Sequence, residues 1–576
     1  MGDASLKSDD YIFRFEICPI DDENEEYCQS GELTNNGETV SVNIACQAYD
    51  EYKIKVTEFS EDLDSLGTIE GNAICLYVRR ELRSLTSNDL TATMDAMYTL
   101  WSTTEEDGYD LYGEKFHNST YFTSAHDFNA AWQDGDHIHE GLGFIPQHIK
   151  ITNIFEESMQ SVDPSVSLFY WDFTIDTSEN LTIFESPMFT SDTFGTLFKP
   201  KDSFWGWTYR DDNLADSIIT DGRWANTLAD YNYAYPALQN GYGYIRGPWN
   251  TNPSPYVVRF AAYSPTLPSC LDYFAWSSDT DFVDFLEIAA YGPHASTHGV
   301  IGSVFGCDML DPLLKQGLIK DEDSQVSICK KWGFYMKELY RGNYIKSNSD
   351  CTVSSLTEDG MSCGFQCNEG QYNDLLDELR STISDAYVPN LSESEWEQWR
   401  DFICTGDGYK VFVGDHLESA SPSDPSFWPI HPTQERLLQA KFMSGAFSVY
   451  KWPEDAVANY VCDKAKCYEP EANSIDFYDD CCYGHYEYDQ LLDFVNGDKN
   501  SGYGPTNHEI FTNTNPIGDY AMPYIYDNFK WSHCEENFDL LFEEDESNKL
   551  MEPIMDTKFD SSAVVDNANP NSVKQS

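Results

Sequence analysis

Two histidines at the start of a helical pattern constrain the fold of this chain most strongly. His139 and His148 stand nine residues apart, with Gly141-Leu142-Gly143 as a turn between them. Apolar residues then follow at helical spacing, at Ile151, Ile154, Phe155 and Met159. Asp163-Pro164 ends the pattern. Two imidazoles beside a bulky apolar shell form half of a metal site, or else they belong to a packed core. This stretch alone leaves both interpretations open.

The length of the chain favours more than one structural unit, because 576 residues exceed the size at which a single core keeps growing. Short runs of alternating apolar and polar residues, such as Tyr11–Ile17 and Val40–Ile44, predict a β-rich start. Helical spacing begins after Val78 and dominates the centre. We therefore expect a β-rich unit at 1–77, a mainly α domain at 78–460 with a cysteine-rich insertion at about 307–408, a Cys/Tyr-rich unit at 461–552 and a disordered tail at 553–576.

The charge of the chain excludes two classes of partner. Its 98 acidic and 35 basic residues give a net charge of −63, spread through all regions. Nucleic acid and anionic membrane surfaces would be repelled, so neither is an expected partner. The acidity favours solubility, with binding of a cationic matrix as the alternative. No run of about 18 apolar residues is present to span a membrane.

The cysteines predict a secreted, disulfide-bonded glycoprotein. Sixteen cysteines occur mostly in clusters, together with three glycosylation sequons at Asn118, Asn180 and Asn390. Disulfides are the expected use of these cysteines, and zinc is the competing one, for instance at Cys363 and Cys367. The first ten residues lack the features of a signal peptide, so we expect that such a peptide was removed or never existed.

Four further histidines stand in patterns suited to a metal. His294 and His298 have i, i+4 spacing, which places both on one helix face. Ala295 follows the first of them, where a zinc protease needs Glu, so that interpretation fails. His126 shares an inward helical face with Phe122 and Ala130. His431 lies within two turns of Asp424-Pro425, which is typical of a helix start.

These six histidines form two groups of three. The first group is His126, His139 and His148, and the second is His294, His298 and His431. Three neutral imidazoles without a carboxylate suit copper, zinc or nickel better than magnesium or calcium. His117 remains an alternative to His126, although it directly precedes a sequon, and a glycan attaches only to exposed chain.

Three blocks of sequence resemble the tyrosinase and catechol oxidase family of type 3 dicopper proteins, which includes molluscan haemocyanin. The first block has the family's spacing of His, Phe, His and Glu and is followed by a run similar to the family's Leu-Pro-Tyr-Trp-Asp-Trp-Thr. The second is the HxxxH of His294 and His298. The third matches Asp-Pro-x-Phe-aromatic-x-x-His. The matching residues are His139, Phe144, His148, Glu156 and Leu168–Thr174 in the first block and Asp424, Pro425, Phe427, Trp428 and His431 in the third.

The resemblance covers roughly Val78 to Tyr460 and implies a four-helix bundle that holds two copper ions, one on each histidine group. It implies oxidation of o-diphenols to o-quinones with dioxygen, as in a polyphenol oxidase. Phenolic small molecules, or tyrosines of other proteins, would be the substrates. A reversible dioxygen carrier and an acidic matrix protein with a vestigial copper site are the alternatives.

Several residues depart from the family's pattern. Gln147 and Ile149 replace the usual Trp and Arg around the third histidine, and Glu435 replaces an Asp. His137 stands where many eukaryotic members have a cysteine joined to the second ligand. Ala295 stands where strong monophenol hydroxylases have Asn, while Glu287 is the candidate for their water-orienting Glu. We therefore expect stronger oxidation of o-diphenols than hydroxylation of monophenols.

Overall fold

A computed structural model describes the chain from residue 12 to residue 534. The described residues exclude 21–27, 35–47, 61–62, 198–213, 232, 260–265, 279–280, 349–350, 354–360, 446, 448–450, 454–480 and 496–497. The predicted strand at 40–44 and the predicted tail at 553–576 lie outside them. The described residues divide into two compact units: one contains residues from 12–78 and 522–526, and the other contains residues from 79–521 and 527–534.

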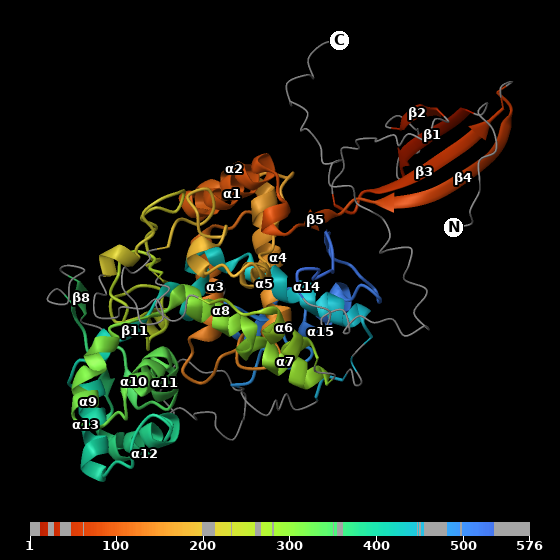
Figure 1. Ribbon diagram of the computed structural model, residues 1–576. Coiled ribbons are helices and arrows are strands. Elements are labelled where there is room, and N and C mark those ends of the chain that lie inside the picture. The colour runs from red at the N-terminus through yellow and green to blue at the C-terminus, as the bar shows by residue number, and fades with distance from the viewer. Residues whose placement is uncertain are drawn as a thin grey trace. The chain divides into compact units, whose positions relative to one another are not determined.

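The smaller unit contains an antiparallel sheet of four strands in the order β2-β1-β3-β4 (Figure 1). Its strands are β1 (Ile12–Pro19), β2 (Gln29–Thr34), β3 (Glu51–Phe59) and β4 (Ser65–Ile74). The disulfide Cys18–Cys28 links the end of β1 to the start of β2. A separate pair joins β5 (Tyr77–Arg79) to β14 (Tyr524–Tyr526). The N-terminal part of the chain is therefore β-rich, as the sequence predicts.

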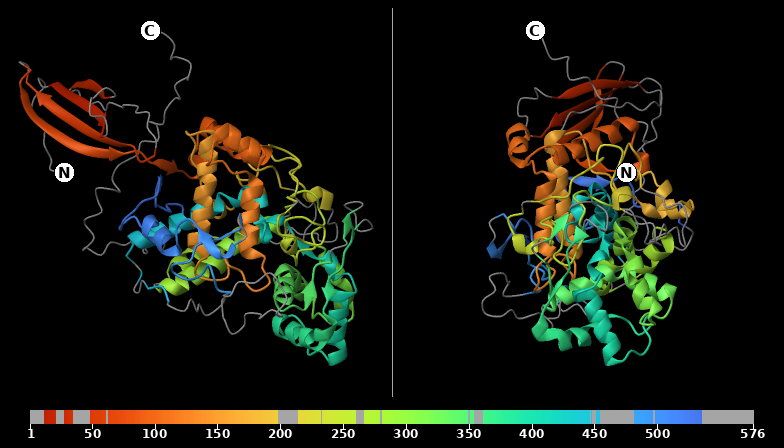
Figure 2. Two further views of the ribbon diagram at one scale, coloured as in Figure 1. Left: turned by 180° about the vertical axis from the view of Figure 1, so that it is seen from behind. Right: turned by 90° about the vertical axis from the view of Figure 1, so that its left-hand side faces the viewer.

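The larger unit is mainly helical, also as expected. Its helices before the insertion are α1 (Ser87–Ser102), α2 (Glu105–Tyr112), α3 (Ser119–Ala130), α4 (Phe144–Val162), α5 (Phe173–Ser178), α6 (Cys270–Ser277), α7 (Phe282–Tyr291) and α8 (Pro293–Gly302). After the insertion come α14 (Ile430–Met443) and α15 (Asn507–Thr514). Figures 1 and 2 show α3, α4, α8 and α14 at the centre of this unit.

Local sequence explains where the central helices begin. The side chain of Asn118 accepts a hydrogen bond from the Tyr121 N–H and caps α3. Pro293 occupies the first turn of α8, where its missing N–H costs no hydrogen bond. Between α4 and α14, the rings of Phe155 and Trp428 stack with centroids 3.6 Å apart, and both are fully buried. This aromatic core fixes the two helices against each other.

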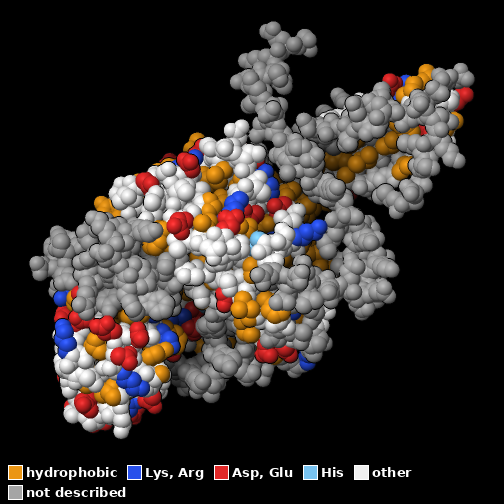
Figure 3. Space-filling model, in the orientation of Figure 1, with side chains coloured by type: hydrophobic (Ala, Val, Ile, Leu, Met, Phe, Trp, Pro, Cys, Tyr) orange, Lys and Arg blue, Asp and Glu red, His pale blue; other side chains and the backbone are white. Residues whose placement is uncertain are grey.

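The cysteine-rich insertion is largely helical. It contains α9 (Asp311–Lys315), α10 (Glu322–Lys330), α11 (Trp332–Arg341), α12 (Tyr372–Thr382) and α13 (Glu393–Cys404). Three disulfides staple it: Cys307–Cys329, Cys351–Cys363 and Cys367–Cys404. On the face seen in Figure 3, acidic and basic side chains are interspersed over these helices. Among all described helices, none is both long enough and apolar enough to cross a membrane.

Candidate metal centre

The structure brings the first three histidines together. His126 comes from α3, His148 from α4 and His139 from the loop between these helices. One ring nitrogen of each lies within 4.8 Å of the others. The Nε2 atoms of His126 and His148 are 3.4 Å apart. Residues 22 positions apart in the chain thus present their ring nitrogens to one point in the interior.

The second three histidines form a matching triad. His294 and His298 lie one turn apart on α8, and His431 lies in the first turn of α14. Their ligand nitrogens again fall within 4.8 Å of one another. The Nε2 atoms of His294 and His298 are 2.9 Å apart. The i, i+4 spacing therefore places both imidazoles on one face, as the sequence predicts.

The two triads are neighbours. The rings of His148 and His431 stack with centroids 4.7 Å apart and an interplanar angle of 9°. His148 also lies 6.4 Å from His294, measured between ring centroids. The structure therefore contains one centre with two three-imidazole sites, rather than two unrelated clusters.

Hydrogen bonds fix the orientation of most of these rings through Nδ1. The partners are the carbonyl of Ser419 for His126, of Phe144 for His148, of His416 for His298 and of Phe427 for His431, at 2.5, 2.7, 2.7 and 2.9 Å. A carbonyl can only accept, so Nδ1 carries the proton in each of these four rings. Their Nε2 atoms are consequently left with lone pairs that point into the centre.

Burial keeps these imidazoles neutral. It lowers the pKa of His126 to about 3, with a smaller effect from the neighbouring His139. Burial and then the adjacent histidines lower the pKa of His148, His294, His298 and His431 well below its usual value. Neutral imidazole is the form that binds a metal ion. The Nε2 of His431 is buried without a hydrogen-bond partner, as expected of an atom that coordinates a metal ion.

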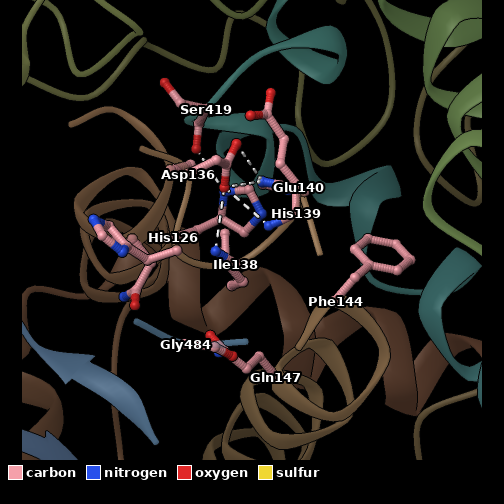
Figure 4. Close-up of polar contacts among 12 residues, drawn as sticks. His126, Asp136, Ile138, His139, Glu140, Phe144, Gln147, Ser419 and Gly484 are labelled. Carbon is pink, nitrogen blue, oxygen red and sulfur yellow. Dashed lines mark hydrogen bonds and ion pairs between the residues drawn. The ribbon is translucent and has the colours of Figure 1, made fainter. Parts of the chain in front are cut away.

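The loop histidine is held by a carboxylate instead of a carbonyl. Asp136 Oδ1 accepts from the His139 N–H at 2.9 Å and lies 3.0 Å from His139 Nδ1 (Figure 4). Burial alone would raise the pKa of Asp136, but interactions with His139, Lys337 and Arg341 hold it well below its usual value. An ionised carboxylate on Nδ1 orients the ring and increases its basicity at Nε2.

Three other residues singled out from the sequence are His117, Glu287 and Ala295. His117 lies outside the first triad, with its Nδ1 2.6 Å from Glu105 and its ring stacked on Tyr121. His126 therefore occupies the position for which both were candidates. Glu287 lies on α7, but its side chain is outside the described residues, so its role stays a prediction. Ala295 lines the cavity described next.

A cavity of about 260 Å³ opens onto the two triads. Its lining includes His139, His294 and His298, and Phe144 and Val413 contribute apolar surface to it. Its lining also includes Lys330 from α10 and Gly333, Phe334 and Lys337 from α11. The cysteine-rich insertion thus contributes one wall of the cavity, which the sequence did not reveal.

His416 was also missed from the sequence. It is fully buried, its ring centroid lies 4.6 Å from that of His298, and its carbonyl accepts from the same residue. Burial lowers its pKa to about 4. Its place just before the third block that resembles the family, eight residues ahead of Asp424, was the available signal.

Two adjacent sites, each of three imidazoles in a helical domain, define a protein that holds a pair of metal ions. Residues 114–315 match the profile of the tyrosinase family, described as the common central domain of tyrosinase. That match includes every candidate ligand except His431. The chain therefore carries a tyrosinase-family domain, as the sequence resemblance predicted. Because that family is dicopper, the pair of ions that the triads fit is copper.

Two individual proteins are also similar to this chain. Grixazone synthase from Streptomyces griseus subsp. griseus is 46% identical over 56 residues, which span 10% of this chain and 16% of the relative. The solved structure of a polyphenol oxidase mutant from Thermothelomyces thermophila covers 64% of this chain and 70% of its own, at 14% identity and a TM-score of 0.30.

Proposed function

We propose that this protein uses two copper ions and dioxygen to oxidise phenols, and that it acts on o-diphenols more readily than on monophenols. The observation that supports this most directly is the pair of adjacent imidazole triads, each of which contributes to the lining of one cavity. When bound, two copper ions supply the redox change that couples oxidation of a diphenol to reduction of dioxygen.

The residues around the triads have three tasks in this reaction. The carbonyls of Ser419, Phe144, His416 and Phe427 keep the Nε2 lone pairs directed inward. Phe144 and Val413 exclude water from the cavity and offer apolar surface to an aromatic ring. The volume of about 260 Å³ is close to the lower end of the range for small-molecule sites, about 300 Å³, and suits a single-ring substrate.

The preference for diphenols rests on Ala295. This residue follows His294 and lines the cavity, but its methyl group offers neither a donor nor an acceptor to a water molecule. A monophenol must lose its proton before it is hydroxylated, and a positioned base accelerates such a step by about 10²–10⁴-fold. A catechol needs less help, because its own two hydroxyls supply the protons and electrons.

One experiment tests the proposal. Copper content is measured on the purified full chain, together with oxygen uptake on a catechol and on a monophenol. We expect two copper ions per chain, rapid uptake with the catechol and slow uptake with the monophenol after a lag. Equal rates without a lag would contradict the diphenol preference. Reversible oxygen binding without turnover would indicate a carrier, and absence of copper would indicate a vestigial site.

Secretion is part of the same proposal. Five disulfides are present among the described residues, which is typical of proteins from oxidising compartments. The sequon residues Asn180 and Asn390 are exposed, as a glycan acceptor must be. We expect protein from the culture medium of the source cells to move faster on a gel after enzymatic deglycosylation, and an unchanged mobility would contradict glycosylation.

A further inference from the structure

Residues 481–485 lie directly against the loop that carries His139. We call these five residues the C-terminal clamp. The carbonyl of Tyr483 lies 2.9 Å from His137 Nδ1. The side-chain amide of Gln147 donates to the carbonyl of Gly484, and Figure 4 shows these two residues together. The clamp therefore contacts the loop on its N-terminal side and at the start of α4.

Glycines allow the two backbones to touch. A Cβ at Gly484 would overlap the carbonyl oxygen of His137, and its φ of +99° is one that other residues rarely adopt. A Cβ at Gly143 would in turn overlap the carbonyl oxygen of Gly484, and one at Gly141 would stand 2.6 Å from the His485 ring. The loop and the clamp are consequently fitted to each other with no space for larger residues.

His485 connects the clamp to the metal centre. Its ring is fully buried, and Nδ1 accepts a hydrogen bond from the Gly143 N–H at 3.2 Å. Nε2 therefore carries the proton and donates it to the Asp136 carbonyl at 2.7 Å. The carboxylate of the same Asp136 holds the backbone and ring of His139. A chain of hydrogen bonds thus runs from His485 through Asp136 to His139.

The clamp is itself held in place. The indole N–H of Trp452 donates to the His485 carbonyl at 3.0 Å. Asn507, at the start of α15, donates to the carbonyls of Gly484 and Tyr486 at 2.9 and 2.8 Å. The carboxylate of Asp489 accepts from the Gly484 N–H at 2.7 Å. These bonds give the clamp a fixed position from which it restrains the loop.

His139 needs such support more than its two partners do. His126 and His148 lie on helices and bond to backbone carbonyls, whereas His139 lies on a loop. We propose that His485 is a positioning residue for the first metal site, which fixes Asp136 and through it the ring of His139. This inference rests on the proposed two-copper centre. It assigns to the C-terminal region a direct part in building that centre.

Two substitutions of His485 separate its two hydrogen bonds. The longer side chain in His485→Gln places an amide donor near the Nε2 position and keeps the bond to Asp136. The shorter one in His485→Asn reaches only toward Gly143. Copper stoichiometry and affinity are measured on the full chain by competition with a chromophoric chelator, without any phenol. Loss of support from outside a ligand typically weakens binding by about 10–100-fold.

We expect wild type and His485→Gln to bind two copper ions tightly, and His485→Asn to bind one tightly and the other about 10–100-fold more weakly. Gly484→Ala should weaken the same ion, while Gly113→Ala, with φ of +91° and no atom within 4 Å of the added Cβ, should not. Tight binding of both ions by a folded His485→Asn, or equal weakening of both, would overturn the inference. A wild type without copper would instead overturn the proposed function.

Discussion

At the scale of single residues, the proposed preference for diphenols depends on one methyl group beside the second triad. Ala295 lines the cavity directly after His294. We predict that Ala295→Asn increases the rate of monophenol hydroxylation relative to diphenol oxidation by about 10-fold or more, because the amide can orient a water that deprotonates the phenol. Oxygen uptake on a monophenol and the matching catechol gives this ratio.

Ser296→Asn is the matched control for that substitution. Ser296 is the next residue on the same helix, but it is exposed and does not line the cavity. The added amide should leave the ratio of the two rates unchanged. A similar increase in both variants would show that the cavity wall at Ala295 is not the cause.

A buried carboxyl at the start of the larger unit predicts a pH dependence of stability. Burial raises the pKa of Glu81 from 4.5 to about 7, against the lowering effect of Arg83. A group with a raised folded-state pKa contributes stability at low pH that is lost as the pH rises from about 4.5 to about 7. The side chain of Glu81→Gln does not titrate. The free energy of unfolding of this variant should therefore rise relative to that of the wild type over this range, by up to about 1.4 kcal/mol per pH unit.

Denaturant unfolding at several pH values measures this difference. The gain of the glutamine variant should level off above pH 7, where Glu81 is ionised in both states of the wild type. Parallel stability curves for the two proteins between pH 4.5 and 7 would contradict the raised pKa.

At the scale of elements, one arginine joins the helices that carry a ligand of each triad. Arg79 is fully buried and bonds to Glu156 of α4 at 2.9 Å and to Glu435 of α14 at 2.7 Å. Glu435 stands where the resembling family usually has Asp, and in this chain its carboxylate accepts from Arg79. We predict that Arg79→Met lowers the free energy of unfolding by about 3–5 kcal/mol, because two buried carboxylates lose their cation.

The control for this substitution is an exposed ion pair. Arg380 bonds to Asp377 and Glu393, whose side chains are 75% and 66% exposed. Arg380→Met should cost less than about 1 kcal/mol, because water screens such pairs. Equal losses in the two variants, measured by denaturant unfolding, would show that Arg79 has no special role between the helices.

Local patterns made the metal centre predictable from the sequence, since each histidine stands beside a helical or aromatic signal. The cavity wall was not predictable in the same way. Lys337 pairs with Asp136 across 201 residues, and His485 bonds to the same residue across 349. Periodicity carries no information about contacts at such separations. Helix α11 is a different case, because its sequence does carry a local signal. The buried residues Trp332, Tyr335, Met336 and Leu339 stand at helical spacing.

At the scale of the whole molecule, the two units should respond differently to metal. All six candidate ligands belong to the unit built mainly from Arg79–Ala521, and the sheet of β1 to β4 contributes none. An ion that binds only the folded state stabilises it by about 2.7 kcal/mol per site at one hundred times Kd. Removing copper with a chelator should therefore lower the melting temperature of the larger unit alone.

Differential scanning calorimetry of the full chain, with copper and after chelation, tests this prediction. We expect two unfolding transitions, and only the transition of the larger unit should move to a lower temperature after chelation. His431→Ala removes a ligand of the second triad only, so the shift on chelation should fall to about half while the smaller transition stays in place. If both transitions moved together, the two compact units would not unfold independently. If neither transition moved, copper would not stabilise the folded protein, and the six histidines would be ordinary residues of a packed core.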